Sequence, residues 1–303
     1  MRHTMSRAAA LAFAGALMAG CAPMPPAAEA AVQPNHSLFG TDAAVTPSAP
    51  DRVLRYAPHP RGFAELRLPA GDGPFPLAVI FHGGCWKTGI ASQAHMAPLA
   101  TRWQQLGIAT LNVDYRELGD GGGWPGSFDD WQAAGGLIEQ VAAKHPIDRA
   151  RVTLVGHSAG ALPAQWLAAA QDANGPVGAR AALAARAAIV LDGPADVGAE
   201  RGAFDALCQF SAVDPFMGGT PAEQPVRYAA LAPATQAPRL EEILFIQAKL
   251  PAPPPSALAA LRAGGARVTV RENPGESHFA VITPGNPAYD GSESAMLAVL
   301  KGE

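Results

Sequence analysis

The sequence predicts an α/β fold in which helices cover both faces of a mostly parallel, doubly wound sheet. Short apolar runs at residues 77–81, 108–113 and 187–191 have the length and composition of buried strands. Between them, segments such as 92–106 repeat their apolar residues at helical spacing. Glycine (32 residues) and proline (29 residues) are plentiful, which suits many loops between short elements. Strands that alternate with helices favour parallel β-α-β units.

The predicted elements follow one another without an internal repeat. The expected strands are 63–68, 77–81, 108–113, 152–155, 187–191, 243–247 and 267–271. The expected helices are 92–106, 128–144, 161–170, 256–262 and 292–300. Residues 197–240 are irregular, with short helical segments near 204–207 and 225–230. We expect them to form a small cap on a single domain that spans 51–303.

Composition narrows the classes of function. The chain has 303 residues, 49% of them hydrophobic, so it can bury one large core. Its formal net charge is −4 and it has no basic block, which argues against nucleic acid as a partner. Residues 121–126 match GxGxxG literally, but Pro125 and the length of the loop argue against a dinucleotide turn. No phosphate-binding loop or metal-spacing cluster is present, so we expect neither a cofactor nor a metal.

The first 20 residues have the features of an export signal. Positive charges at Arg2 and Arg7 precede an apolar run, 8–19, that is too short to span a bilayer. The run ends in Leu-Met-Ala-Gly-Cys21, which resembles a bacterial lipobox, whose cysteine is lipidated and becomes the mature N-terminus. An ordinary signal peptide that happens to contain a cysteine remains the alternative.

Two further expectations follow from that resemblance. Ala22, rather than Asp, follows the cysteine, and in lipoproteins this implies export to the outer membrane, facing the periplasm. Residues 21–50 are rich in Ala and Pro and favour a tether between the lipid and the domain. Apart from Cys21, the chain has only Cys85 and Cys208; an oxidising periplasm would favour a disulfide, but spacing alone does not decide whether they meet.

Ser158 is the predicted nucleophile. It is the centre of Gly-His-Ser-Ala-Gly at 156–160, between a predicted strand and a predicted helix. This strand–turn–helix arrangement of G-x-S-x-G is the nucleophile elbow. The serine adopts a strained turn, so the residues two before and two after it must be small for strand and helix to approach.

The loop after the strand 77–81 supplies the predicted oxyanion hole. Its sequence, His82-Gly83-Gly84-Cys85-Trp86, resembles the HGG-type loop of esterases and lipases. Glycines let backbone N–H groups approach the negative oxygen that forms when a serine attacks a carbonyl. We expect the donors to be the N–H of Gly84 or Cys85, with Gly83 less favoured, together with that of Ala159. Trp86 is expected beside the substrate, and His82 and His157 are expected to be structural.

His278 is the predicted general base. With this elbow the partners follow in the chain order Ser, acid, His, and His278 is the histidine that comes after the last strand. It lies in a loop, Asn-Pro-Gly-Glu-Ser-His-Phe, where it has no helix or strand to pack into.

With these motifs in place, residues 77–279 resemble the α/β-hydrolase superfamily. The branch they are most similar to holds kynurenine formamidase-like and bacterial BD-FAE-like esterases. The matching segments are HGGCW (82–86), NVDYR (112–116), GGGWPG (121–126), GHSAG (156–160), GGTP (218–221) with RY (227–228), and GESHF (275–279).

The acid is missing from the place where that resemblance implies it. Related sequences carry Gly-x-x-Asp-x-x-Val-Pro after the strand 243–247, but here the Asp position falls on Leu250 or Pro251. Asp192 is ranked first as a replacement, because some lipases of this fold take their acid from the end of the preceding strand. Glu276, two residues before His278, is ranked second. Asp196, Asp214 and a Ser–His dyad without an acid remain as alternatives.

The predicted function is that of a serine hydrolase. It would cleave a small-molecule carboxylic ester, or less favourably an amide, through an acyl-enzyme intermediate. A weak or inactive relative that serves as an envelope-binding lipoprotein is the alternative from another class, and a prolyl-oligopeptidase-like peptidase is a third. The sequence does not predict the oligomeric state.

Overall fold

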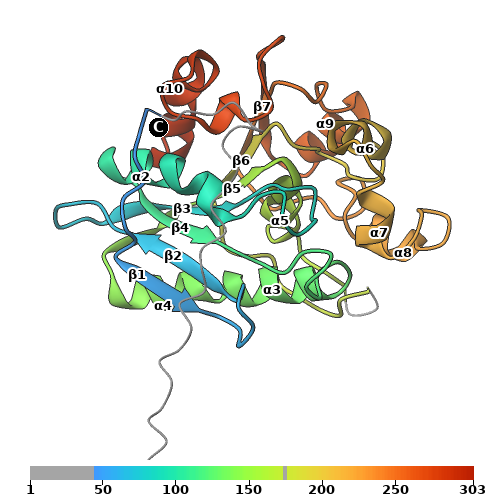
Figure 1. The fold of residues 1–303 in the computed structure, drawn as a ribbon, viewed down its shortest axis with the longest axis horizontal. Helices are drawn as coiled ribbons and strands as arrows, with labels where there is room; N and C mark the ends of the chain where they lie inside the picture. Colours follow the sequence, from blue (N-terminus) through green and yellow to red (C-terminus); the bar gives the residue numbers. More distant parts are fainter. Residues whose placement is uncertain (1–43, 173–175) are drawn as a thin grey trace, which may run out of the picture. The chain divides into compact units, whose positions relative to one another are not determined.

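An eight-stranded sheet forms the centre of the computed structural model, which describes residues 44–172 and 176–303 (Figure 1). The strands are β1 (Arg52–Arg55), β2 (Phe63–Arg67), β3 (Phe75–Phe81), β4 (Ala109–Val113), β5 (Ile147–His157), β6 (Ala187–Leu191), β7 (Glu242–Gln247) and β8 (Arg267–Glu272). Their order across the sheet is β1-β2-β4-β3-β5-β6-β7-β8. β1 and β2 are antiparallel additions, and all pairs from β4 to β8 are parallel, as predicted. The carboxyl ends of the parallel strands therefore share one edge, where ligands bind in such sheets.

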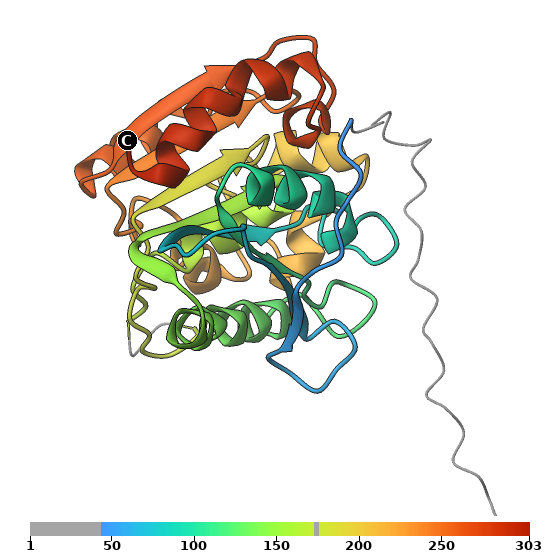
Figure 2. The same ribbon diagram turned by 90° about the vertical axis from the view of Figure 1, so that its left-hand side faces the viewer.

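Helices cover both faces of the sheet, which confirms the predicted fold class. One face carries α2 (Ala97–Gln105) and α10 (Pro287–Lys301), and the other carries α3 (Gly126–Gly135), α4 (Leu137–Lys144), α5 (Ala161–Trp166) and α9 (Pro255–Ala263). Figure 2 shows α10 and α2 on one side of the strands and α3 and α4 on the other. Alternation along β3 supplies both cores: Val79 and Phe81 pack with α3 and α5, whereas Ala78 and Ile80 pack with α2 and α10.

Several helices differ in extent from their predicted ranges. The predicted helix 128–144 is two helices, α3 and α4, with a break at Gly136. The helix after Ser158 ends at Trp166 rather than near residue 170. The last helix begins five residues earlier than predicted, because the Asn286 side chain caps the N–H of Ala288 and Pro287 occupies the first helical position.

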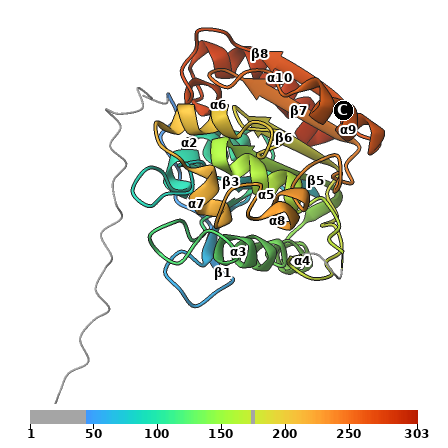
Figure 3. The same ribbon diagram turned by 90° about the vertical axis from the view of Figure 1, so that its right-hand side faces the viewer.

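The irregular segment 197–240 contains three short helices. These are α6 (Arg201–Cys208), α7 (Val213–Met217) and α8 (Pro225–Ala229), which we call the cap helices. Figures 1 and 3 place them next to one another, on the side of the molecule where α5 lies. The Asp205 carboxylate accepts hydrogen bonds from Ala212 N and Val213 N, so α6 fixes the start of α7.

The domain starts before residue 51. Residues 44–50, which the sequence places in the tether, are bound to it: Ala44 N donates to Pro284 O, and Ser48 O accepts from Arg67. The predicted signal segment 1–20, Cys21 and the tether up to residue 43 lie outside the described residues. Within the described part of the chain, no helix has the length and apolar character needed to cross a membrane.

Candidate active site

Ser158 occupies a tight turn between β5 and α5. Its φ of 55° lies in the left-handed region, which is strained for a residue with a side chain. A Cβ on Gly156 would lie 2.0 Å from Gly160 O, and one on Gly160 would lie 2.2 Å from Phe81 O. Both glycines are therefore required by close backbone approach, as the elbow pattern predicts. The Ser158 hydroxyl is buried and has no hydrogen-bond partner among the described residues.

Asp192 and His278 are hydrogen-bonded to each other. Asp192 follows β6 directly, and His278 Nδ1 donates to its Oδ2 over 2.7 Å. The Asp192 side chain is fully buried, whereas 15% of the His278 side chain is exposed. An imidazole that donates through Nδ1 carries its free lone pair on Nε2, which is the form a general base needs.

The loop that lacks the expected acid holds Asp192 instead. Three successive N–H groups, from Ala248, Lys249 and Leu250, each donate to the Asp192 carboxylate over 2.9 Å. Burial by itself raises the pKa of Asp192, but the hydrogen bond and charge of His278, followed by these N–H groups, lower the pKa below its ordinary value. The carboxylate is therefore charged at neutral pH. A sequence motif does not reveal these backbone donors, because every residue except proline supplies an N–H.

The other candidate acids are engaged elsewhere or lie apart from His278. Asp196 accepts from Gly198 N and Ala199 N, as a structural turn does. Asp214 binds Arg201 and the Tyr228 hydroxyl within the cap. In the described part of the chain, the Glu276 carboxylate makes no hydrogen bond to His278.

His157 places the Ser158 turn against the loop of His278. Its Nε2–H donates to His278 O over 3.1 Å, and the centroids of the two imidazole rings lie 4.5 Å apart. Burial, followed by the charge of His278, lowers the pKa of His157 to about 3, so this ring stays neutral. His157 thus has a structural position, as the sequence predicts, but one that contacts the predicted base directly.

The HGGCW loop, residues 82–86, lies against the same elbow. A Cβ on Gly83 would come within 2.9 Å of both His157 Nδ1 and the Ser158 Cβ, so only glycine fits there without displacement. Among the described residues, no hydrogen bond uses the N–H of Gly84 or Cys85. Buried N–H groups are almost always paired. Unpaired ones beside a nucleophilic serine are suited to receive an oxyanion.

The HGGCW loop also contacts a buried charged cluster through His82. His82 Nδ1 donates to Gly83 O over 2.6 Å, and His82 Nε2 contacts Asp114 Oδ1 at 3.1 Å. Burial lowers the pKa of His82, but the hydrogen bond to Asp114 and the charge of Glu117 raise it above its ordinary value. Burial raises the pKa of Glu117 to about 7, although His82 and Arg61 oppose that shift.

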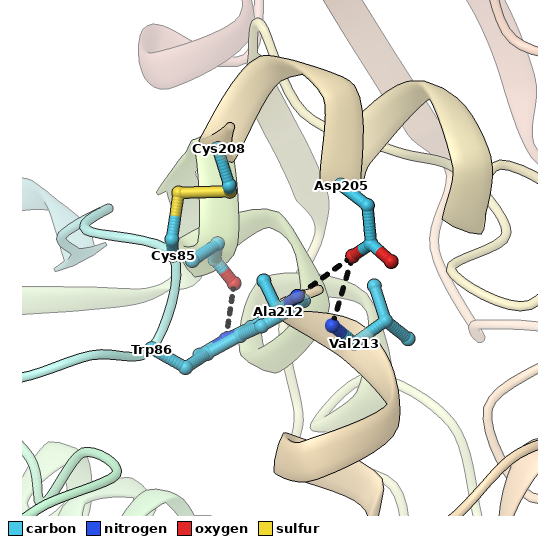
Figure 4. The surroundings of a disulfide bond; sticks show 7 residues. Cys85, Trp86, Asp205, Cys208, Ala212 and Val213 are labelled. Atoms are coloured by element: carbon cyan, nitrogen blue, oxygen red, sulfur yellow. Dashed lines mark hydrogen bonds between the residues drawn. A yellow bond between two sulfur atoms is a disulfide. The ribbon is translucent and has the colours of Figure 1, made fainter. Parts of the chain in front are cut away.

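Cys85 and Cys208 form a disulfide, which the sequence alone left open. Figure 4 shows Cys85 on the HGGCW loop and Cys208 on α6. Trp86, the next residue, donates its Nε1–H to Ala159 O over 3.1 Å and is fully buried. The predicted site residues Gly83, Gly84, Cys85, Trp86, Ser158, Ala159, Asp192 and His278 therefore lie together at the carboxyl edge of the sheet.

Comparisons with known proteins agree with this fold. A search of curated protein sequences found no match. Among solved structures, Thermogutta terrifontis esterase 2 phosphonylated by sarin has a TM-score of 0.61 at 20% identity, over 84% of this chain and 97% of that one. A truncated carbohydrate esterase from gut microbiota has a TM-score of 0.58 at 19% identity, over 86% of this chain and 99% of that one.

A bifunctional GH43-CE protein of Bacteroides eggerthii has a TM-score of 0.59 at 22% identity and covers 81% of this chain. This chain spans only 34% of that protein's length. These likenesses show an α/β-hydrolase fold. The BD-FAE family model matches residues 65–247, more than half of the chain and a stretch that contains the HGGCW loop, Ser158 and Asp192. On that match, the chain belongs to the BD-FAE family.

Proposed function

We propose that this protein is a serine hydrolase that cleaves carboxylic esters through an acyl-enzyme. The observation that carries the proposal is the 2.7 Å hydrogen bond from His278 Nδ1 to the buried Asp192 carboxylate, in a loop that binds His157, the residue before the elbow serine. It supports Asp192, ranked first from the sequence, as the acid whose usual position is empty in this chain. That empty position is the reason to consider an inactive binding protein as the alternative.

The proposed mechanism assigns a task to each group. Ser158 Oγ attacks the ester carbonyl while His278 Nε2 takes its proton, and the imidazolium that forms is stabilised by Asp192. The N–H groups of Ala159 and of Gly84 or Cys85 stabilise the oxyanion. His278 returns the proton to the departing alcohol. It then activates a water molecule, which releases the carboxylic acid from Ser158.

The acyl group tested first should be small. The solved structures that share the fold include a carbohydrate esterase and forms of Thermogutta terrifontis esterase 2 with propionate or butyrate bound. We therefore propose short-chain esters, including an O-acetylated sugar, as the substrate class.

The test compares Ser158→Ala with the wild type on p-nitrophenyl acetate, p-nitrophenyl butyrate and an O-acetylated sugar. Ser256→Ala, at an exposed serine on α9, is the matched control. The proposal predicts that hydrolysis and labelling by a fluorophosphonate probe disappear in Ser158→Ala and persist in Ser256→Ala. A folded wild type that neither hydrolyses these esters nor accepts the probe would contradict it.

We also propose that the protein is exported and held at the cell envelope by a lipid on Cys21. The support is indirect: the Cys85–Cys208 disulfide is of a kind that persists in oxidising compartments. Cys21→Ser should move the protein from the membrane fraction to the soluble fraction and abolish incorporation of labelled palmitate. Unchanged fractionation of Cys21→Ser would refute the anchor.

A further inference from the structure

The HGGCW loop has a backbone conformation that its own sequence does not favour. Cys85 has a φ of 53° and Trp86 a φ of 52°, two consecutive non-glycine residues in the left-handed region. Such residues persist only where surrounding contacts hold them. In the proposed mechanism this same backbone carries an oxyanion donor, so whatever holds the loop also sets the position of that donor.

Among the contacts that hold this loop, two lead to α6. Cys85 is bonded to Cys208 at the end of α6, 123 residues away in the chain. Trp86 packs against Phe204 of the same helix, with ring centroids 4.8 Å apart, and stacks on Phe216 of α7 at 4.4 Å. The Trp86 Nε1–H donates to Ala159 O, so this ring also joins the loop to the residue that carries the second proposed donor.

The helix on which the disulfide is anchored is itself fixed. Asp205, one turn before Cys208, accepts hydrogen bonds from Ala212 N over 2.8 Å and Val213 N over 3.0 Å, as Figure 4 shows. An ion pair from Arg201 to Asp214 joins the same two helices. A disulfide to a fixed helix restrains the loop, whereas one to a free segment would not.

We infer that Cys208 is a positioning residue for the oxyanion hole and that the Cys85–Cys208 disulfide is needed for full catalysis. This inference rests on the proposed function. The disulfide holds Cys85, and through it the neighbouring N–H groups, at the place where the ester oxygen becomes negative. When a dithiol reduces it, the dithiol is oxidised to its cyclic disulfide, and Cys85 and Cys208 each gain one electron and one proton as thiols. The loop can then relax from its left-handed conformation.

The expected loss is one of turnover rather than of binding. Deleting one oxyanion donor costs ~10²–10³ in kcat, so a donor that is only displaced should cost about 10- to 100-fold. KM should change by no more than about twofold, because the ground-state carbonyl uses the donors less than the transition state does. A trifluoromethyl ketone, which forms an oxyanion on the serine, should lose affinity by the same factor as kcat/KM.

The experiment measures kcat, KM and trifluoromethyl ketone affinity for the wild type with and without dithiothreitol and for Cys208→Ser. Arg201→Gln is the matched control, because it removes an exposed ion pair of the cap and leaves both the HGGCW loop and the Asp205 hydrogen bonds that fix α6 in place. We expect the turnover loss in reduced wild type and in Cys208→Ser, and near wild-type kcat in Arg201→Gln.

Three outcomes would overturn the inference: a folded Cys208→Ser with kcat within twofold of wild type, an equal loss in Arg201→Gln, or a loss in reduced wild type that appears only together with loss of near-ultraviolet circular dichroism. The last comparison serves if Cys208→Ser does not fold. Oxidised wild type without Ser158-dependent hydrolysis would instead refute the proposed function, so the two failures are distinguishable.

Discussion

Asp192→Asn tests the carboxylate that we propose as the acid of the triad. In the wild type one carboxylate oxygen accepts from Ala248 N and Leu250 N, and the other accepts from Lys249 N and His278 Nδ1. An asparagine can satisfy only one of these two pairs with its carbonyl. Its NH₂ group then faces Lys249 N and His278 Nδ1, because an imidazole nitrogen can become an acceptor and a backbone N–H cannot. There the NH₂ group donates to His278 Nδ1 and forces the ring proton onto Nε2.

The magnitude follows from that tautomer. An imidazole protonated on Nε2 cannot take the Ser158 proton, and the corresponding change in a Ser-His-Asp triad lowers kcat by ~10⁴. At about 1.4 kcal/mol per factor of ten, this is roughly 5 kcal/mol of transition-state stabilisation. The N–H of Lys249 loses its acceptor as well, which should lower the free energy of unfolding by about 1–3 kcal/mol.

The assay is hydrolysis of p-nitrophenyl acetate, together with urea unfolding to show that the variant is folded. Glu276→Gln is the matched control, because Glu276 lies two residues from His278 without binding it. It should keep kcat within about twofold, since it leaves the hydrogen bond that sets the tautomer. The reasoning is refuted if Asp192→Asn keeps more than a tenth of wild-type kcat, and a large loss in Glu276→Gln would move the acid to that residue.

Three further predictions concern the surroundings of the site. The pKa of Glu117 is raised from 4.5 to about 7, so the folded state binds a proton that the unfolded state releases, and the free energy of unfolding falls as pH rises through that window. Glu117→Gln should make this fall between pH 5 and pH 8, measured by urea unfolding, less steep. An unchanged slope would contradict the shift. The pKa of His157 is lowered from 6.5 to about 3, so the free energy of unfolding falls as pH drops below 6.5. His157→Gln removes this dependence, so its free energy of unfolding relative to the wild type should be about 2 kcal/mol higher at pH 5 than at pH 8. No such gain would refute the burial of His157 as a neutral ring. Gly83→Ala should lower kcat at least about tenfold, because its Cβ would displace Ser158. Gly291→Ala is the control, since its Cβ meets nothing within 4 Å. Equal activity of the two variants would count against the close approach.

The parts of the fold that depend on local sterics could be predicted from the sequence. The buried strands are recognisable as apolar runs, and the elbow is recognisable because Gly156 and Gly160 have no room for a Cβ. β1 is not predicted, since its four residues are mostly exposed at the sheet edge and have no apolar pattern. The break at Gly136 was also missed, because an isolated glycine does not by itself end a helix.

The parts of the site that depend on distant segments could be ranked but not fixed. Asp192 reaches His278 across β7, and three backbone N–H groups after β7 hold it, which no residue pattern encodes. The disulfide depends on where the irregular cap places Cys208, and the cap has no periodicity from which to infer this. The link from Trp86 to the carbonyl of Ala159 likewise required the fold.

The most direct test of the central claim, that Ser158 forms an acyl-enzyme, is an acid quench within the first turnover of p-nitrophenyl acetate, followed by peptide mass spectrometry. The account predicts an acetyl group on the peptide that contains Ser158, formed in step with a burst of p-nitrophenol equal to the enzyme concentration or less. Both should vanish in Ser158→Ala. Ester hydrolysis with no acetyl group on that peptide, or with the acetyl group on another residue, would contradict the account.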